Sequence, residues 1–186
     1  MDLTTLGSRN IGATNAFRVL GPGWGGLVFA LDVAKGALAA FVPTVLAAVG
    51  WTGTSRLLLL SMAGGVAAIL GHTLSPWLRF RGGKGVATSL GVFLAIQPLP
   101  TGIAFGLWIV LFLASRFRVS VASIGASLVY PFLVWFLFGG RSGRLALTAV
   151  AAAVSGLVLL RHRENIRRIL AGTERPIVER RGGGGR

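Results

Sequence analysis

The sequence predicts an all-α integral membrane protein with about six transmembrane helices, one of them short or tilted. Two observations come from composition: 53% of the 186 residues are hydrophobic and only 13% are charged, whereas about a quarter of an ordinary soluble domain is charged. The third is spacing, because the uncharged stretches approach the roughly 20 residues that cross a bilayer. These features exclude an ordinary water-soluble enzyme.

The expected segments are, in order, 23–49, 57–78, 85–97, 101–115, 119–140 and 145–160. The uncharged run 85–115 is divided because Pro98 and Pro100 predict a turn at 97–100. The piece 85–97 is then about 20 Å long at about 1.5 Å per residue, so it barely spans a bilayer. We expect it to be tilted or sunk in the bundle.

The basic residues fall mainly on one face of this six-span arrangement. Of the 19 Lys and Arg, only Arg56, Arg141 and Arg144 lie on the opposite face, and Lys35 lies within the membrane. The positive-inside rule therefore makes the basic face cytoplasmic. That face comprises residues 1–22, 75–84, 116–118 and the chain after 160. We expect residues 1–174 to form one membrane domain and residues 175–186 to form a basic, disordered tail.

The net charge of +14 suits anionic lipid head groups, anionic substrates or nucleic acid. Nucleic acid is the weakest of these partners, because the basic residues are dispersed at span ends with few aromatic residues among them. The absence of cysteine excludes disulfides, thiolate metal sites and a cysteine nucleophile. Because His72 and His162 are the only histidines, we expect no metal site and no cofactor.

The first polar segment, 6–18, precedes the first span. Its neutral polar side chains are those of Ser8, Asn10, Thr14 and Asn15. Such donors suit an oxyanion, and Gly7 and Gly12 allow turns that expose backbone N–H groups. Arg18 adds a positive charge. The alternative is an interfacial loop without chemistry.

Two pairs of polar residues lie three apart within the spans and are therefore neighbours on a helix. Asp32 and Lys35 form a buried ionisable pair, for which a functional role is the default hypothesis and a structural ion pair is the alternative. Ser120 and Ser123 begin a later span, where they could hydrogen-bond between helices or reach the same site.

The turn Gly82-Gly83-Lys84-Gly85 opens directly into a helix. It predicts a phosphate cradle, because free N–H groups and the positive end of the helix dipole would face an anion beside the Lys84 ammonium. It is not a Walker A loop, since Gly85 follows the lysine and no strand precedes it. The alternative is a basic loop that only anchors the topology. His72 lies near the end of the preceding helix, where it fits a structural role as well as it fits participation in the site.

Residues 161–174 predict an interfacial amphipathic helix or an extension of the last span, with Gly172 as its C-cap. His162 and Asn165, at i and i+3, share one face of this helix. The alternative is a basic helix that only rests on lipid.

Taken in order, these motifs resemble the bacterial acyl-phosphate:glycerol-3-phosphate acyltransferases, the PlsY family. The matching runs are Gly7-Ser8-x-Asn10-x-Gly12-Ala13-Thr14-Asn15-x-x-Arg18, Asp32-x-x-Lys35-Gly36, Gly71-His72 with Phe80-x-Gly82-Gly83-Lys84-Gly85-Val86-Ala87-Thr88, and His162-x-x-Asn165-Ile166-x-Arg168 with Gly172-x-Glu174. The resemblance implies a multi-pass enzyme of the bacterial inner membrane whose active site faces the cytoplasm. It implies acyl transfer from acyl phosphate to the 1-hydroxyl of glycerol 3-phosphate, giving lysophosphatidic acid for phospholipid synthesis, without acyl-CoA or a metal.

Two features depart from this family. Its members begin with an additional membrane helix ahead of the Gly-Ser motif, giving seven spans, so we expect a shortened or late-started version here. Arg9 replaces the glycine that is usual between the serine and the asparagine, and we expect it to reshape the first turn.

The resemblance and the residue chemistry together predict the site. The expected catalytic residues are Ser8, Arg18, Lys84, His162 and Asn165. The expected phosphate-binding residues are Asn10, Thr14, Asn15, Gly82, Gly83, Gly85 and Arg168, with Asp32, Lys35, His72 and Ser123 as secondary candidates. Ser8 holds the acyl phosphate in this interpretation, and Arg18 and Lys84 neutralise charge on the transferring centre. His162 and Asn165 orient glycerol 3-phosphate, and the base is either His162 or a phosphate oxygen of the substrate.

Two other functions remain open from the residues alone. A membrane carrier for phosphorylated small anions would use Asp32 and Lys35 as its translocation pair. A shortened homologue without activity is the other alternative.

Overall fold

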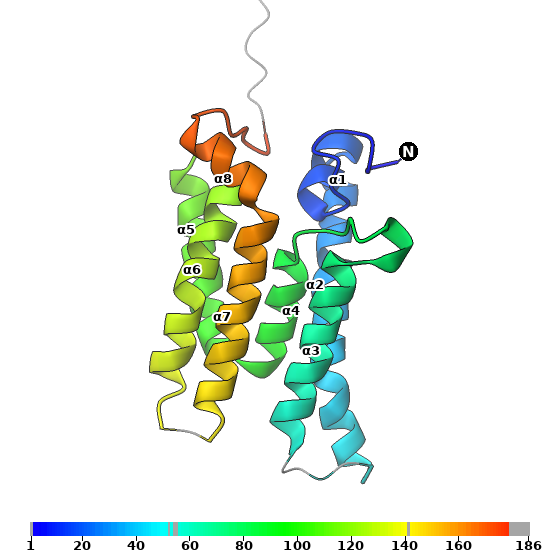
Figure 1. Ribbon diagram of the computed structural model, residues 1–186, viewed down its shortest axis with the longest axis vertical. Coiled ribbons are helices and arrows are strands. Elements are labelled where there is room, and N and C mark those ends of the chain that lie inside the picture. Colours follow the sequence, from blue (N-terminus) through cyan, green and yellow to red (C-terminus); the bar gives the residue numbers. More distant parts are fainter. Residues whose placement is uncertain (1, 52, 54–55, 141, 179–186) are drawn as a thin grey trace, which may run out of the picture.

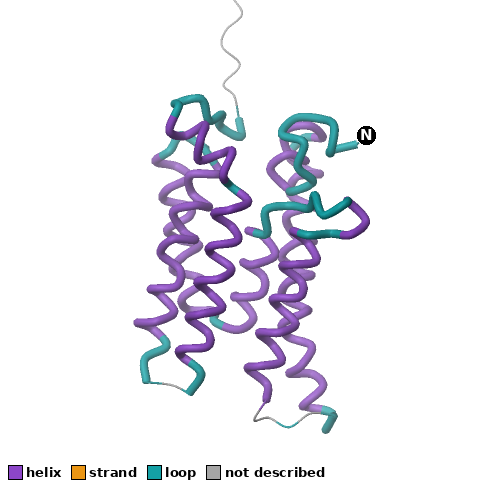
Figure 2. Tube along the Cα trace, in the orientation of Figure 1, coloured by secondary structure: helices purple, strands orange, loops and turns teal. Residues whose placement is uncertain are grey.

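The chain folds into a bundle of α-helices with roughly parallel long axes (Figures 1 and 2). The computed structural model describes residues 2–51, 53, 56–140 and 142–178. Within them lie α1 (Ala13–Leu20), α2 (Pro22–Ala48), α3 (Leu57–Thr73), the 3₁₀ helix η2 (Pro76–Leu78), α4 (Val86–Ile96), α5 (Pro98–Ala114), α6 (Val119–Leu137), α7 (Arg144–Arg161) and α8 (Arg163–Leu170).

The lengths and composition of these helices confirm the predicted all-α membrane class. α2, α3 together with the residues up to Leu78, α6 and α7 are each long and apolar enough to cross a membrane, and α4 and α5 are shorter apolar helices. All six predicted segments are thus helical along most of their length. The predicted span 57–78 is shorter than expected, because α3 ends at Thr73 and the chain then turns into η2.

The predicted division of the run 85–115 is confirmed, but its turn is tighter than 97–100. Only Gln97 separates α4 from α5, and Pro98 and Pro100 lie in the first turn of α5. Proline is tolerated there, because the first N–H groups of a helix have no intrahelical partner. The Thr101 hydroxyl donates to the Gln97 carbonyl at 2.6 Å and so supports the junction.

The helices form two groups with α4 between them (Figure 1). α2 packs against α1, α3 and α4, whereas α6 packs against α5 and α7. Glycines bring α2 and α4 together: a Cβ atom at Gly36 would meet the Thr88 carbonyl, and one at Gly91 would meet that of Val33. Small residues at such crossings are typical of membrane helix pairs.

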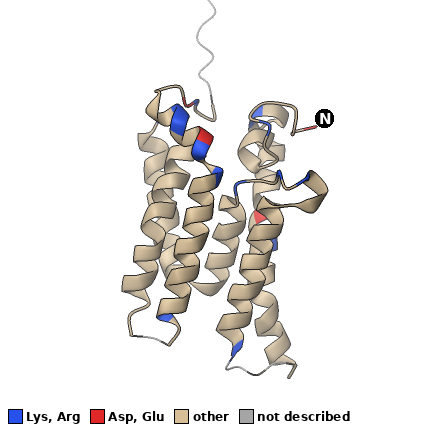
Figure 3. Ribbon diagram, viewed as in Figure 1, with Lys and Arg blue, Asp and Glu red and all other residues tan. Residues whose placement is uncertain are grey.

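Most of the described Lys and Arg residues lie at the end of the bundle that carries α1, α8 and the loop before α4 (Figure 3). At the other end, the described basic residues are Arg56, before α3, and Arg144, at the start of α7. Arg141 lies outside the described residues. The sides of the bundle expose large apolar side chains such as those of Leu38 and Phe136, which suits contact with lipid.

Two short helices flank the basic end. The first polar segment, for which no helix was predicted, contains the helix α1, which begins after Gly12. α8 is a separate helix after α7, in agreement with the interfacial alternative, and Gly172 follows it at φ 69° as expected of a C-cap. Most of the predicted tail, residues 179–186, lies outside the described residues.

Candidate active site

A cavity of about 480 Å³ lies between the two helix groups and reaches the basic end of the bundle. Its polar part is lined by all five residues predicted to be catalytic, Ser8, Arg18, Lys84, His162 and Asn165. Its apolar part is lined by side chains of α2, α4, α5, α6 and α7, among them Phe29, Phe93, Trp108, Tyr130 and Val154. The cavity therefore joins a charged compartment to an apolar one, a combination that fits an anionic head group with a hydrocarbon chain.

The other predicted residues are divided between this cavity and its surroundings. The cavity is also lined by Asn10, Thr14, Asn15, Asp32, His72, Gly85 and Ser123. Arg168 lines an adjoining pocket together with Ser8, Arg18 and Glu174. Gly82, Gly83 and Lys35 line neither of these two pockets. Within the described part of the chain, no three His, Cys, Asp or Glu side chains are grouped so as to hold a metal ion.

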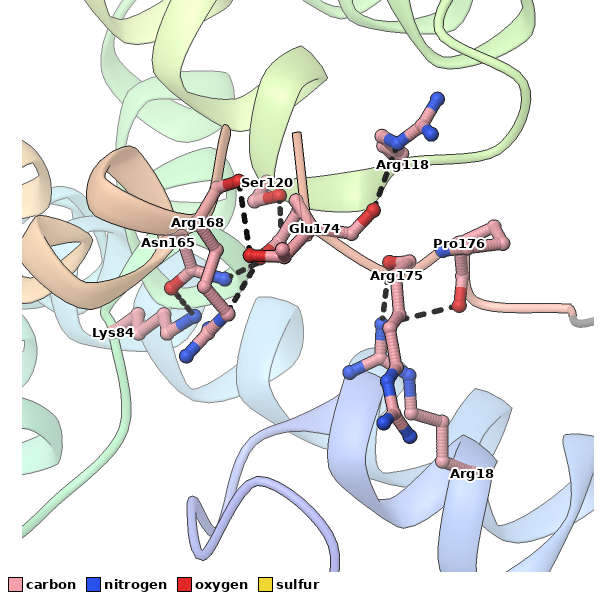
Figure 4. A network of polar contacts seen from close by, with 10 residues as sticks. Arg18, Lys84, Arg118, Ser120, Asn165, Arg168, Glu174, Arg175 and Pro176 are labelled. Carbon is pink, nitrogen blue, oxygen red and sulfur yellow. Dashed lines mark hydrogen bonds and ion pairs between the residues drawn. The ribbon is translucent and has the colours of Figure 1, made fainter. Parts of the chain in front are cut away.

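Glu174 is the centre of a polar network that connects α6, α8 and the loop before α4 (Figure 4). Its Oε1 accepts hydrogen bonds from Ser120 Oγ at 2.6 Å and from Asn165 Nδ2 at 2.7 Å. Its Oε2 accepts one from Arg168 Nε at 2.7 Å. Because Asn165 donates to Glu174, its Oδ1 is turned toward Lys84, whose Nζ donates to it at 2.5 Å.

The charges in this network are set by burial and hydrogen bonding. Burial lowers the pKa of Lys84 to about 8, although the Glu174 carboxylate opposes that shift and the charges of Arg168 and Arg18 add to it. Burial acts to raise the pKa of Glu174, but the hydrogen bonds from Ser120, Arg168 and Asn165 outweigh it and leave the pKa below its usual value. At pH 7 Glu174 is therefore ionised and Lys84 is mostly a cation, in a place that favours a bound anion.

His162 lies at the junction of α7 and α8 and is 2% exposed. Its Nδ1 lies 2.8 Å from the Val158 carbonyl oxygen, so Nδ1 carries the proton and Nε2 is an acceptor. Burial and the charge of Lys84 lower the pKa of His162 to about 4. The imidazole is therefore neutral at pH 7, and Nε2 can accept a hydrogen bond from a substrate hydroxyl.

The two glycines before Lys84 are held from both sides. The N–H groups of Gly82 and Gly83 donate to the carbonyls of Thr73 and His72 at 3.2 and 3.1 Å, respectively. Their own carbonyls accept hydrogen bonds from the Arg161 guanidinium at 2.6 and 3.2 Å, respectively. These N–H groups are thus engaged within the protein, and their predicted role in binding phosphate stays a prediction that requires a phosphate to displace the carbonyls of Thr73 and His72.

The N–H groups that remain for an anion at this turn are those of Lys84, Gly85 and residues 86–88, the first three of α4. Among the described residues they donate to no protein acceptor, as expected at the start of a helix. Gly85 is the N-cap at φ 83°, a left-handed conformation that favours glycine. The predicted anion site at this helix start therefore remains a prediction that rests on Lys84 and Gly85.

Asn15 holds the first polar segment together. It is 1% exposed and accepts the Ser8 N–H on Oδ1 at 2.8 Å, and its Nδ2 donates to the carbonyls of Leu3 and Leu6. Gly7, at φ 60°, lies against this Oδ1, where a Cβ atom would collide. Asn15 therefore shapes the turn that carries Ser8, and its predicted role in binding phosphate stays a prediction, since its Oδ1 and Nδ2 already have partners in the protein.

Arg9 and Asn10 complete the same turn. Arg9 has a left-handed φ of 55°, which glycine adopts more readily than arginine, so the departure from the family motif falls on a strained residue. Asn10 Oδ1 accepts the Gly12 N–H at 2.9 Å. Its amide NH₂ is left for the cavity that it lines.

Arg18 connects α1 to the chain after α8 (Figure 4). Its Nη2 donates to the carbonyls of Arg175 and Pro176 at 3.1 and 3.3 Å. The Ile177 N–H donates to the Phe117 carbonyl at 2.9 Å, and Ile177 lines the cavity. The segment 175–177 therefore runs beside the cavity from α1 to the α5–α6 loop.

Sequence reasoning did not single out Glu174 or Arg161 as site residues. Glu174 was part of the family motif and Ser120 was considered together with Ser123, but neither observation predicted the hydrogen bond between Ser120 and Glu174. Ser123 instead accepts a hydrogen bond from Trp108 Nε1 at 3.1 Å. Nothing in the sequence around Arg161 except its charge indicated a role, because the carbonyls to which it donates, those of Gly82 and Gly83, lie far away in the sequence.

The family model described as glycerol-3-phosphate acyltransferase matches residues 1–172. The chain belongs to this family. The glycerol-3-phosphate acyltransferase of Aquifex aeolicus is 41% identical over 174 residues, which are 94% of this chain and 84% of that protein. The one from Rubrobacter xylanophilus is 40% identical over 186 residues, 100% of this chain and 86% of that protein.

Solved structures of a relative share the fold. PlsY (YgiH), an integral membrane glycerol 3-phosphate acyltransferase, is 37% identical in its glycerol 3-phosphate form, with a TM-score of 0.79 over 95% of this chain and 82% of that one. Its lysophosphatidic acid form is 36% identical, with a TM-score of 0.75 over 91% and 80%. The predicted family and the multi-pass membrane class are therefore confirmed.

Proposed function

We propose that this chain transfers an acyl group from acyl phosphate to the 1-hydroxyl of glycerol 3-phosphate, giving lysophosphatidic acid and phosphate. The observation that carries the proposal is the cavity, whose charged part holds Lys84 and whose apolar part lies within the bundle. Acyl phosphate and the lysophosphatidic acid product each combine a phosphate with a hydrocarbon chain. Family membership supports the same activity, as do structures of a relative in glycerol 3-phosphate and lysophosphatidic acid forms.

The site is proposed to face the cytoplasm of a bacterial inner membrane, with residues 1–174 acting as one domain. The concentration of Lys and Arg at the end that carries the site supports this orientation (Figure 3). Glycerol 3-phosphate is a soluble anion and would reach the cavity directly from that side.

Two phosphate groups must lie close together for this reaction. Lys84 and the N–H groups at the start of α4 suit one of them, since both the ammonium and the helix dipole favour an anion. Arg18 and Arg168, which line the adjoining pocket with Ser8, suit the other. Charge-assisted hydrogen bonds from Arg18 to a phosphate are stronger than those that it donates to the neutral carbonyls of residues 175 and 176.

The transfer forms a bond between the 1-oxygen of glycerol 3-phosphate and the acyl carbonyl carbon, and breaks the bond from that carbon to the phosphate oxygen. No covalent enzyme intermediate is required, because phosphate is a good leaving group from a mixed anhydride. His162 Nε2 accepts a hydrogen bond from the 1-hydroxyl of glycerol 3-phosphate and so directs the oxygen of that hydroxyl at the acyl carbonyl carbon. With a pKa of about 4, His162 is a weak base at neutral pH. The hydroxyl proton therefore does not stay on His162: as the bond to carbon forms, it passes through Nε2 to an oxygen of the departing phosphate, whose charge Lys84 stabilises.

Reconstitution of the purified protein in liposomes tests this activity. We expect release of phosphate from an acyl phosphate only when glycerol 3-phosphate is present, with one lysophosphatidic acid formed per phosphate, as measured by mass spectrometry. Acyl-CoA should not replace the acyl phosphate. Uptake of glycerol 3-phosphate without acyl transfer would support the carrier alternative and overturn the proposal.

A further inference from the structure

A group of ionisable side chains, with Asp32 and His72 buried and the Lys35 side chain 43% exposed, lies beside the proposed site and has no part in the chemistry described so far. Lys35 Nζ donates to Asp32 Oδ1 at 2.5 Å and lies 2.7 Å from His72 Nδ1. Asp32 is 8% exposed and His72 is 9% exposed, and both line the cavity. Removing the Asp32 and His72 side chains from water is costly, which argues for a role of this pair beyond joining α2 to α3.

The contacts determine how the His72 ring is held. An ammonium has donors only, so its contact with Nδ1 makes that nitrogen the acceptor and leaves the proton on Nε2. Asp32 Oδ1, which binds the same ammonium, lies 3.4 Å from Nδ1. Lys35 and Asp32 therefore determine both the tautomer and the orientation of the imidazole.

The opposite edge of this ring lies against the glycine turn. A Cβ atom added at Gly83 would collide with His72 Nε2 and with the ring carbons on either side of it. On the other side of the turn, the Arg161 guanidinium holds the carbonyls of Gly82 and Gly83. The turn is thus confined between an imidazole and a guanidinium, and Lys84 follows it directly in the chain.

We propose that His72, oriented by Lys35 and Asp32, is a positioning residue that seats the glycine turn and thereby aims Lys84 at the reacting phosphate. The inference rests on the proposed acyl transfer. This positioning role explains why residue 83 is a glycine: a side chain there would collide with the imidazole. The reason is therefore space for the ring, and not exposure of an N–H group to the substrate. Misplacing a catalytic group by about 1 Å can slow a reaction about a hundredfold, so a support of this kind affects turnover.

A double-mutant cycle at the two contacting residues tests the proposal. We expect Gly83→Ala to lower kcat about a hundredfold, because its methyl group displaces the turn from the ring. His72→Ala should lower kcat about tenfold and leave KM for acyl phosphate nearly unchanged, since the Lys84 charge is kept. The combined variant should be no slower than His72→Ala, because the added methyl group enters the space that the imidazole leaves. Losses that simply multiply would overturn the proposal.

Further variants separate positioning from folding. Lys35→Arg, which keeps a donor for Nδ1, should restore most of the turnover that Lys35→Met loses. Gly156→Ala is the matched control, because a Cβ atom at this helical glycine meets nothing within 4 Å, and it should turn over like the wild type. All variants are compared at equal amounts of protein with the same elution by size exclusion. If Lys35→Met kept full kcat, the positioning role would be refuted while the wild-type activity stood. An inactive wild type would refute the proposed function as well.

Discussion

Replacement of Glu174 by glutamine changes one oxygen of the carboxylate into an NH₂ group and removes the negative charge. The carboxylate accepts three hydrogen bonds, from Ser120, Asn165 and Arg168. Glutamine keeps a single acceptor oxygen, so its NH₂ group must face donors on one side of the network. Because Asn165 is then free to turn, its Oδ1 is no longer directed at Lys84.

The expected loss of stability follows from these contacts. A hydrogen bond to a charged group contributes about 1.5–3 kcal/mol, and a buried donor left without an acceptor costs a similar amount. The Arg168 side chain is 43% exposed, so water compensates part of its loss. We expect about 2 kcal/mol of destabilisation in total, which corresponds to a Tm lower by about 4–8 °C for a chain of this size.

The substitution also affects the charge of Lys84. The Glu174 carboxylate raises the pKa of Lys84 against the effect of burial, so its neutral replacement should lower that pKa further. The Lys84 ammonium would then be lost at lower pH than in the wild type, and kcat/KM should begin to fall nearer to neutrality. Thermal unfolding followed by tryptophan fluorescence and a kcat/KM profile from pH 6 to about 10 measure the two effects.

Glu164→Gln is the matched control, because the Glu164 side chain is 60% exposed and pairs with Arg167 on the helix surface at 3.8 Å. It should change neither Tm nor the pH profile. The reasoning about the network would be refuted if Glu174→Gln behaved like Glu164→Gln in both measurements.

Three further predictions follow from the same structure. The wild-type kcat/KM should fall as pH rises through about 8, where the Lys84 ammonium is lost. Lys84→Arg should be slower than the wild type but should keep its rate above that pH. If Lys84→Arg lost activity above that pH as the wild type does, the assignment of this titration to Lys84 would be contradicted. Arg116→Cys should be labelled by an impermeant maleimide only from the cytoplasmic side and Arg144→Cys only from the other side, since the chain has no other cysteine; the reverse pattern would invert the topology. Asn15→Ala should lower both Tm and turnover, because the turn at Ser8 loses the hydrogen bonds that hold it. A variant as stable and as active as the wild type would refute this structural role of Asn15.

The fold was largely predictable because it depends on local properties. The lack of charge over about 20 residues identifies a membrane helix wherever it lies in the chain. Pro98 and Pro100 likewise mark the start of α5 by their own backbone constraints, although the turn itself contracts to Gln97. The short helix α1 was missed because its 8 residues, with Thr14, Asn15 and Arg18 among them, are too few to show a detectable apolar period.

Which residues line the cavity was largely predictable from the sequence, but the hydrogen bonds among them were not. The polar segments identify Lys84, His162 and Asn165, yet which hydrogen bonds they make depends on chain distant in sequence. Glu174, in the segment after α8, accepts a hydrogen bond from Ser120 on α6, and no pattern in either segment predicts this pairing. The amides of Asn15 and Gly83 were assigned to phosphate for the same reason, because a sequence does not show whether a donor is already satisfied within the fold.

The most direct test of the account is the turnover of Lys84→Ala in reconstituted membranes with matched protein levels. The account assigns to this ammonium the stabilisation of charge on the departing phosphate, and loss of one such donor typically costs on the order of 3 kcal/mol. We therefore expect kcat to fall by about a hundredfold or more, with partial recovery in Lys84→Arg. Near-normal turnover and affinity for both substrates in Lys84→Ala would mean that the turn is only a basic anchor, and would contradict the central assignment.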